Sequence, residues 1–174
     1  LAYLLSRGWS IYREQVPSRF YSHAHRGEFV IGVLKGIRVG NVWKSGENPP
    51  ITITYDTPLS KVMELIPVTT QTVFPVLDKD GNYSGLLALN QVRRIIYEKE
   101  VSQLMIAEEI AVRDLEPLRA DSDLSLAMTD FARSDYDELP IVDADGRKFL
   151  GLLRRQELLA AYEKRLAEMQ GVKS

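Results

Sequence analysis

The sequence contains no cysteine among its 174 residues, and its two histidines, His23 and His25, both lie near the N-terminus. The absence of cysteine excludes disulfide bonds, thiolate metal sites and cysteine nucleophiles. Two histidines alone do not complete a metal site, so we interpret them as linker residues. A P-loop glycine run and a dinucleotide-binding fingerprint are also missing from the sequence. We therefore expect that the chain is not an enzyme.

A strong excess of charge and long apolar runs are absent as well. The sequence has 22 Lys and Arg against 24 Asp and Glu, a formal net charge of -2. This balance excludes a general binder of nucleic acids or membrane surfaces. No apolar run approaches the roughly 20 residues that cross a bilayer. With 45% hydrophobic and 26% charged residues, the composition is typical of a globular domain.

An internal repeat is the main feature that the sequence does contain. Its two copies are offset by 65 residues, and a one-residue insertion separates their last matched segments. The matched segments are 56–63 with 121–128, 74–81 with 139–146, and 85–87 with 151–153. A repeat of this length indicates two copies of one supersecondary unit.

Each copy begins with an expected strand and helix. Short strands are predicted near 51–55 and 116–120, each after a lead-in segment at 36–42 or 109–115. Thr57 and Ser122 are predicted helix caps, with Pro58 in a first turn that needs no amide hydrogen. Apolar residues then recur at i, i+3, i+4 and i+7, which predicts a helix buried on one face. They are Leu59, Val62, Met63 and Ile66 in the first copy and Leu124, Ala127, Met128 and Phe131 in the second.

The second half of each copy is predicted to be a β-hairpin followed by a helix. The apolar strands 73–77 and 139–142 each precede an Asp-Gly turn, at 80–81 and 145–146. The turn leads into a strand that ends at Leu87 or Leu153. Helices over residues 90–100 and 155–170 complete the two units. Turn chemistry next to glycine accounts for Asp78, Asp80, Asp143 and Asp145 without a metal.

The expected fold class is therefore α/β (α+β), with two pseudo-symmetric βαββα repeats packed as one module. A unit of about 60 residues cannot bury both faces of its sheet alone, so the copies should pack together. A small ligand is expected in the cleft between them. We assign residues 1–36 to a linker, 37–100 and 101–170 to the two repeats, and 171–174 to a tail.

Over residues 37–165 this pattern resembles a pair of CBS (cystathionine-β-synthase-type) domains. The resemblance is carried by the order of strand, helix, Phe/Leu-Pro strand, Asp-x-x-Gly turn, Gly-Leu-Leu strand and helix. It implies a regulatory module that forms a homodimer and binds an adenine nucleotide, ATP, ADP or AMP, between the copies.

The N-terminal segment points to a parent protein. The chain begins at Leu1, and we expect it to be a piece of a longer protein. Residues 10–17 and 22–26 resemble the linker after the last membrane helix of CLC-type chloride channels and proton-chloride exchangers. This resemblance implies a domain on the cytoplasmic face of a membrane that modulates anion transport, with the transmembrane domain of the same protein as its partner. A purely structural dimerisation tail and a CBS module of another transporter or enzyme are the alternatives.

The resemblance also implies a set of binding residues. In nucleotide-binding CBS domains the last strand continues as Gly-h-h-(Thr/Ser)-x-x-Asp, where h is apolar and the Asp holds the ribose. The second copy has Glu157 at the Asp position and Arg154 at the hydroxyl position, whereas the first copy has Gln91 and Ala88. The implied wall around the base consists of Thr52, Gln71, Thr72, Val73, Phe74 and Pro75, with Gln71 in place of a stacking aromatic residue.

Less ligand-specific interpretations of these residues stay open. Glu157 and Arg154 also fit a solvated helix start in a pocket that has lost its ligand. Residues 136–140 with Gln91 form a second candidate pocket, or a polar loop before a buried strand. The pairs 93–94 and 154–155 are both Arg-Arg, and they indicate either a surface for lipid or nucleotide phosphate or the solvated faces of two helices.

Overall fold

The computed structural model describes residues 23–43, 49–96 and 104–171. The resemblance to a membrane linker at residues 10–17 lies outside these residues. Among the described helices, none combines the length and the apolar character required of a transmembrane span. The elements are α1 His23–Leu34, α2 Val39–Val42, β1 Ile53–Thr54, α3 Leu59–Leu65, the 3-10 helix η1 Ile66–Val68, β2 Val73–Leu77, β3 Tyr83–Ala88, α4 Leu89–Ile96, α6 Ala107–Ile110, β4 Leu118–Arg119, α7 Leu124–Arg133, β5 Glu138–Val142, β6 Phe149–Arg154 and α8 Arg155–Met169.

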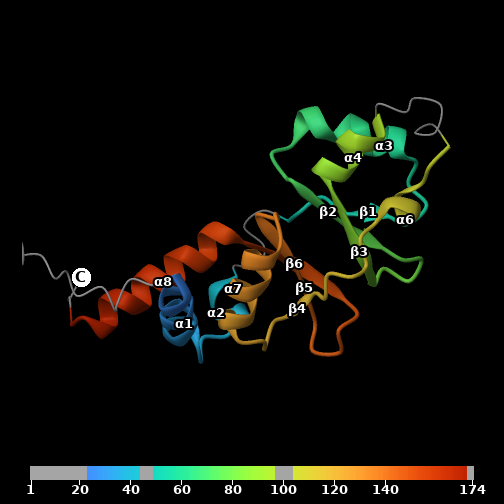
Figure 1. Cartoon of the computed structure of the whole chain (residues 1–174). Coiled ribbons are helices and arrows are strands. Elements are labelled where there is room, and N and C mark those ends of the chain that lie inside the picture. Colours follow the sequence, from blue (N-terminus) through green and yellow to red (C-terminus); the bar gives the residue numbers. More distant parts are fainter. Residues whose placement is uncertain (1–22, 44–48, 97–103, 172–174) are drawn as a thin grey trace, which may run out of the picture.

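The elements form two units with the same topology, as the repeat predicts (Figure 1). One three-stranded sheet has the order β1-β2-β3 and the other β4-β5-β6. In each sheet the first pair is parallel and the second antiparallel. The strand registers agree as well: Ile53 pairs with Val76 in the first sheet, and the equivalent residues Leu118 and Ile141 pair in the second. The predicted pair of βαββα repeats is therefore confirmed.

Helices cover one face of each sheet, and the two other faces meet. In the first unit Phe74, Val76 and Leu87 pack with residues of α3 and α4. Their strand neighbours Val73, Leu86 and Ala88 point the opposite way and pack against Leu152 of the second unit. Because both faces of the strands are buried, their sequences are almost continuously apolar.

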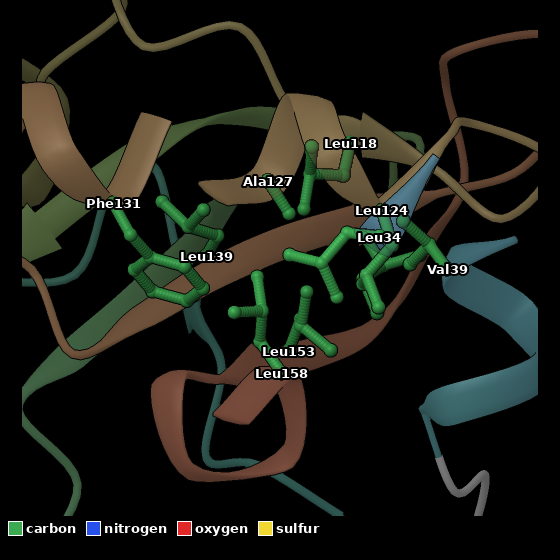
Figure 2. Packing of buried hydrophobic residues seen from close by; sticks show 10 residues of the cluster. Leu34, Val39, Leu118, Leu124, Ala127, Phe131, Leu139, Leu153 and Leu158 are labelled. Carbon is green, nitrogen blue, oxygen red and sulfur yellow. The ribbon is translucent and has the colours of Figure 1, made fainter. Parts of the chain in front are cut away.

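The core of the second unit extends into the N-terminal part of the chain. Figure 2 shows Leu34 and Val39, from the end of α1 and from α2, packed among leucines of the second unit. Leu34 and Val39 are fully buried, and α1 also contacts α7 and α8. Leu34 and Val39, which precede β1 and which the sequence assigns to the linker and to the first repeat, thus belong to the hydrophobic core of the second unit.

The segments that precede β1 and β4 are exchanged between the units, and in the second copy this lead-in segment begins at residue 105, ahead of the predicted 109–115. Val39 and Gly40 donate their N–H groups to the carbonyls of Ser122 and Ala120, at 3.0 and 2.8 Å. In the same way, Ala107 and Glu108 of α6 donate to the carbonyls of Thr57 and Tyr55, at 2.8 and 2.9 Å. Matching bonds run from the Leu124 N–H to the Ile37 carbonyl, 2.7 Å, and from the Leu59 N–H to the Met105 carbonyl, 2.9 Å. Each unit is therefore completed by the lead-in segment of the other.

Two predicted helix caps are wrong. The N-cap of α3 is Pro58 and that of α7 is Asp123, whose carboxylate accepts the Ser125 N–H at 2.9 Å. The hydroxyls of Thr57 and Ser122 instead accept the N–H groups of the residues three positions earlier, both at 3.1 Å. Short hydroxyl side chains bond readily to nearby backbone, and here they close the turn between strand and helix.

The predicted Asp-Gly turns are confirmed. Gly81 and Gly146 have φ values of 78° and 75°, a region that favours glycine. The Asp78 carboxylate accepts two backbone N–H groups, from Asp80 and Asn82, each at 2.8 Å. Asp143 accepts from the backbone N–H groups of Arg147 and Lys148. The bonds from Asn82 and Arg147 are the main reason that the pKa of each aspartate is lowered.

The glycines that begin the Gly-Leu-Leu motifs make room for the exchanged segments. A Cβ atom on Gly151 would lie 2.6 Å from ring atoms of Trp43, which follows α2. A Cβ atom on Gly85 would lie 3.0 Å from the carbonyl oxygen of Val112, which follows α6. Close approach of the lead-in segment therefore requires glycine at both positions.

We expect Gly151→Ala to lower the free energy of unfolding by about 1–3 kcal/mol, because the methyl group overlaps the Trp43 ring. Urea denaturation measures the effect, with Gly32→Ala in α1 as the control: a Cβ on Gly32 would have no neighbour within 4 Å, so this substitution should cost nothing and, within a helix, stabilise by up to about 1 kcal/mol. In a Trp43→Ala background, Gly151→Ala should lower the free energy of unfolding by a smaller amount, because the ring that it overlaps is absent. An equal cost in both backgrounds would show that the contact with Trp43 is not the reason for the glycine.

Candidate functional site

A cleft of about 840 Å³ lies between the two units, where the repeat predicts a ligand site. This volume is typical of pockets that bind small molecules. The cleft is lined by Pro49, Pro50 and Ile51 before β1, by Thr69, Thr70, Gln71 and Thr72 before β2, and by Asp137, Glu138, Arg154, Arg155, Gln156 and Leu159 of the second unit. Both units thus contribute to one cavity.

Glu138 links the two units at this cleft. Among the residues that the structure describes it is the one charged side chain that is buried, with 8% of its surface exposed. Its carboxylate accepts the Thr72 N–H at 3.2 Å and the Thr72 hydroxyl at 3.3 Å. The other carboxylate oxygen lies 3.4 Å from Nε of Arg154. The buried charge is therefore balanced by one cation and hydrogen bonds from the opposite unit.

The two arginines of the cleft differ in how firmly they are held. Arg155 donates to the backbone carbonyls of Phe131 and Tyr136, at 3.2 and 2.6 Å, and to Asp137 at 3.1 Å. Its guanidinium also lies 4.7 Å from the centre of the Phe131 ring. The Arg154 side chain is 51% exposed and its ion pair with Glu138 is long. Arg154 is consequently the cation of the cleft that is available to a ligand.

The Gln71 side chain is hydrogen-bonded to backbone groups of its own unit. Its Oε1 accepts the Ile51 N–H at 2.8 Å, and its Nε2 donates to the Ile51 carbonyl at 2.8 Å and the Val73 carbonyl at 2.7 Å. These bonds lie just before the first residue pair of the β1–β2 ladder, Ile53 with Val76. The carboxamide thus continues the pairing of the two segments at the edge of the cleft.

The other residues predicted to contact a nucleotide do not line this cleft. Thr52 is exposed but does not line the cleft, and Val73, Phe74 and Pro75 are buried in β2. Glu157 accepts the Arg154 N–H at 2.8 Å, which caps the start of α8. It lines a separate cleft of about 620 Å³ between α2 and α8. The structure therefore brings together only Gln71, Thr72 and Arg154 of the set.

A third cleft, of about 500 Å³, repeats the first by pseudo-symmetry. Tyr136 lines it at the position that Gln71 occupies in the first cleft. Four acids, Asp114, Glu116, Asp130 and Asp135, surround a single lining cation, Arg133. Burial raises the pKa of Asp130, and Glu116 adds to this effect whereas Arg133 opposes it. A ligand that carries phosphate is disfavoured here by the acids.

The structure corrects the prediction of a second pocket around residues 136–140 with Gln91. Tyr136 does line the third cleft, but Asp137 and Glu138 line the first. Gln91 is not among the lining residues, and its side chain accepts the Ala88 N–H at 3.0 Å. The predicted strand begins at residue 139, so the sequence leaves Glu138 at the end of a polar run, whereas the structure makes it the first residue of β5. In the described part of the chain, no group of three or more acidic, His or Cys residues suits a metal ion.

Comparison with known proteins gives one family and many similar structures. A family model described as "CBS domain" matches residues 43–98 and 107–164. The structure of CBSX2 in complex with AMP, a protein named from Arabidopsis thaliana, is 22% identical, has a TM-score of 0.62, and covers 74% of this chain and 98% of that one. A CBS domain-containing protein of unknown function from Bacillus anthracis is 21% identical, with a TM-score of 0.64 and coverage of 75% and 96%.

A further similar structure is CbpB in complex with c-di-AMP. It is 16% identical, has a TM-score of 0.63, and covers 85% of this chain and 99% of that one. No curated protein matches the sequence. At these low identities the similar structures show the fold.

We expect Glu138→Ala to lower the free energy of unfolding by about 1–3 kcal/mol, because the Thr72 N–H and hydroxyl lose their acceptor. Glu138→Gln should cost less, since its carbonyl oxygen can still accept one of these bonds. Urea denaturation measures both, with Glu163→Ala on the exposed surface of α8 as the control. A Glu138→Ala protein as stable as the control would show that this link does not stabilise the pair of units.

Proposed function

The chain belongs to the CBS domain family, and we propose that it is a regulatory module that binds an adenine nucleotide in the cleft between its two units. The observation that carries the proposal is the position of Arg154, a half-exposed cation in a cleft built by both units. Phosphate groups are bound well by arginine. The bound AMP and c-di-AMP in two similar structures support the same class of ligand.

The charges in the cleft favour a ligand with few phosphates. Its ionisable lining residues are Asp137, Glu138, Arg154 and Arg155, so their formal charges cancel. Arg155 is already bonded to Asp137 and to two carbonyls, which leaves Arg154 as the main phosphate contact. Pro50 and Leu159 add apolar lining on which a base can pack. We therefore propose AMP, ahead of ADP and ATP, as the ligand.

Glu157 is left out of the proposed contacts. Its carboxylate caps α8, and it lines the cleft beside α2. A contact between Glu157 and the ribose would require the first turn of α8 to rearrange.

We expect Arg154→Ala to weaken AMP binding roughly 10- to 100-fold, the loss of one hydrogen-bonded charge pair. Binding of adenosine, which has no phosphate, should change little. Isothermal titration calorimetry measures both, with Arg165→Ala as the control, because Arg165 is on α8 but lines the cleft beside α2. Absence of heat with millimolar AMP, ADP and ATP for the unmodified protein would overturn the proposed function.

We further propose that the module is the cytoplasmic tail of a CLC-type chloride channel or exchanger and forms a homodimer within it. The sequence of residues 10–17 and 22–26 supports this parent. In the structure, Leu34 at the end of α1 is buried in the second unit, and the Gly36 N–H donates to Asp123 at 2.7 Å. A movement of α1 would therefore be transmitted to the second unit, and from there to the cleft.

We expect the coding sequence upstream of Leu1 to specify several apolar spans. Replacing the module in that parent protein by an unrelated linker should remove any effect of adenine nucleotides on chloride flux. Flux that keeps its nucleotide response after the replacement would contradict regulation by the module. An upstream sequence without apolar spans would instead favour a CBS module of an enzyme.

A further inference from the structure

We propose that Gln71 occupies the base-binding edge of the cleft with its own carboxamide and that a ligand base binds by displacing it. Gln71 would then determine both the affinity of the cleft and its preference for bases. This inference rests on the proposed function, because it concerns the same cleft and the same class of ligand.

The backbone hydrogen bonds of Ile51 are both made by Gln71. This residue presents one backbone donor and one backbone acceptor toward Gln71, and the carboxamide satisfies both at 2.8 Å. Ile51 and Gln71 both line the cleft. The backbone groups of Ile51 therefore lie where a ligand could reach them, but they are already paired.

The carboxamide of Gln71 has the same hydrogen-bonding pattern as one edge of adenine. It places an acceptor oxygen beside a donor NH₂ group. Adenine has the same arrangement in its ring nitrogen N1 and its 6-amino group. A base with this edge can make the two bonds to Ile51 in place of Gln71, so binding exchanges two hydrogen bonds for two others. The gain in free energy from these bonds is then small, which makes Gln71 a competitor of the base.

The other unit has no counterpart of this glutamine. At the position equivalent to Gln71, the third cleft has Tyr136, and at the position of Ile51 it has Glu116. A phenol has no adjacent donor and acceptor and cannot copy this pairing. The occupied edge is thus a property of the first cleft, and it does not follow from the repeat itself.

The hydrogen bonds of Gln71 also stabilise the fold locally, apart from any effect on ligand binding. The third bond, from Nε2 to the Val73 carbonyl, holds the side chain against β2. The ladder of Ile53 and Thr54 with β2 does not involve Gln71. Substitution of Gln71 should therefore loosen the segment before β1 without removing the sheet.

The test measures adenosine binding by calorimetry for the unmodified protein and for Gln71→Ala. We expect the variant to bind adenosine about tenfold more tightly, equivalent to about 1.4 kcal/mol. Purine riboside, which lacks the 6-amino donor, should gain less than adenosine. Thr70→Ala is the matched control, because Thr70 is an exposed neighbour on the same wall of the cleft; its adenosine affinity should not change.

Gln71→Met provides a second variant that keeps the length of the side chain and cannot make the paired bonds. It should also bind adenosine more tightly, and thermal unfolding establishes that both variants are folded. If the folded variants bind adenosine no more tightly than the unmodified protein, while that protein binds AMP, the role of Gln71 is overturned and the proposed function stands. If neither the unmodified protein nor the variants bind AMP or adenosine, both are overturned.

Discussion

The exchange of lead-in segments is the constraint on which the rest of the structure depends. Three backbone hydrogen bonds attach the segment before each unit to the turn between strand and helix of the other unit. Buried backbone groups have to be paired, and in each unit part of this pairing is available only from the other. Gly85 and Gly151 leave the space that the close approach requires. The two units are consequently one folding module, and a cleft between them has fixed walls.

The contact between the two sheets combines apolar packing with polar links, one of which is the backbone hydrogen bond from the Tyr83 N–H to the Arg147 carbonyl at 2.8 Å. Val73, Leu86 and Ala88 pack against Leu152, and the rings of Tyr83 and Phe149 stack with centroids 6.4 Å apart. Glu138 crosses the same boundary to the backbone and side chain of Thr72. Apolar contact stabilises the pair without fixing its orientation, whereas hydrogen bonds have strict geometry. The link between Glu138 and Thr72 therefore acts together with the backbone bonds between the units to place the cleft residues relative to each other.

Pseudo-symmetry gives the module equivalent clefts, but their side chains have diverged. The first cleft combines two acids with two arginines and has a glutamine at the edge proposed to bind a base. The third cleft combines four acids with one arginine and has a tyrosine at that position. Backbone topology sets where a ligand can lie, and these few side chains decide which ligand is favoured. One ligand site in the pair is therefore a better expectation than two equal ones.

The sequence by itself determined the repeat, the order of the elements, the Asp-Gly turns and the cleft between the copies, because these follow from periodicity and from local turn chemistry. The resemblance of the sequence to CBS domains implied Gln71, Thr72 and Arg154 as site residues, and these three do line the cleft. Only the tertiary structure decided that the lead-in segments change partners, since hydrogen bonds between segments about 50 and about 80 residues apart leave no local pattern. It likewise decided that Glu157 caps α8 and that Glu138 is buried at the cleft. The sequence shows where a carboxylate lies along the chain, but its hydrogen-bond partners depend on which segments the fold packs around it.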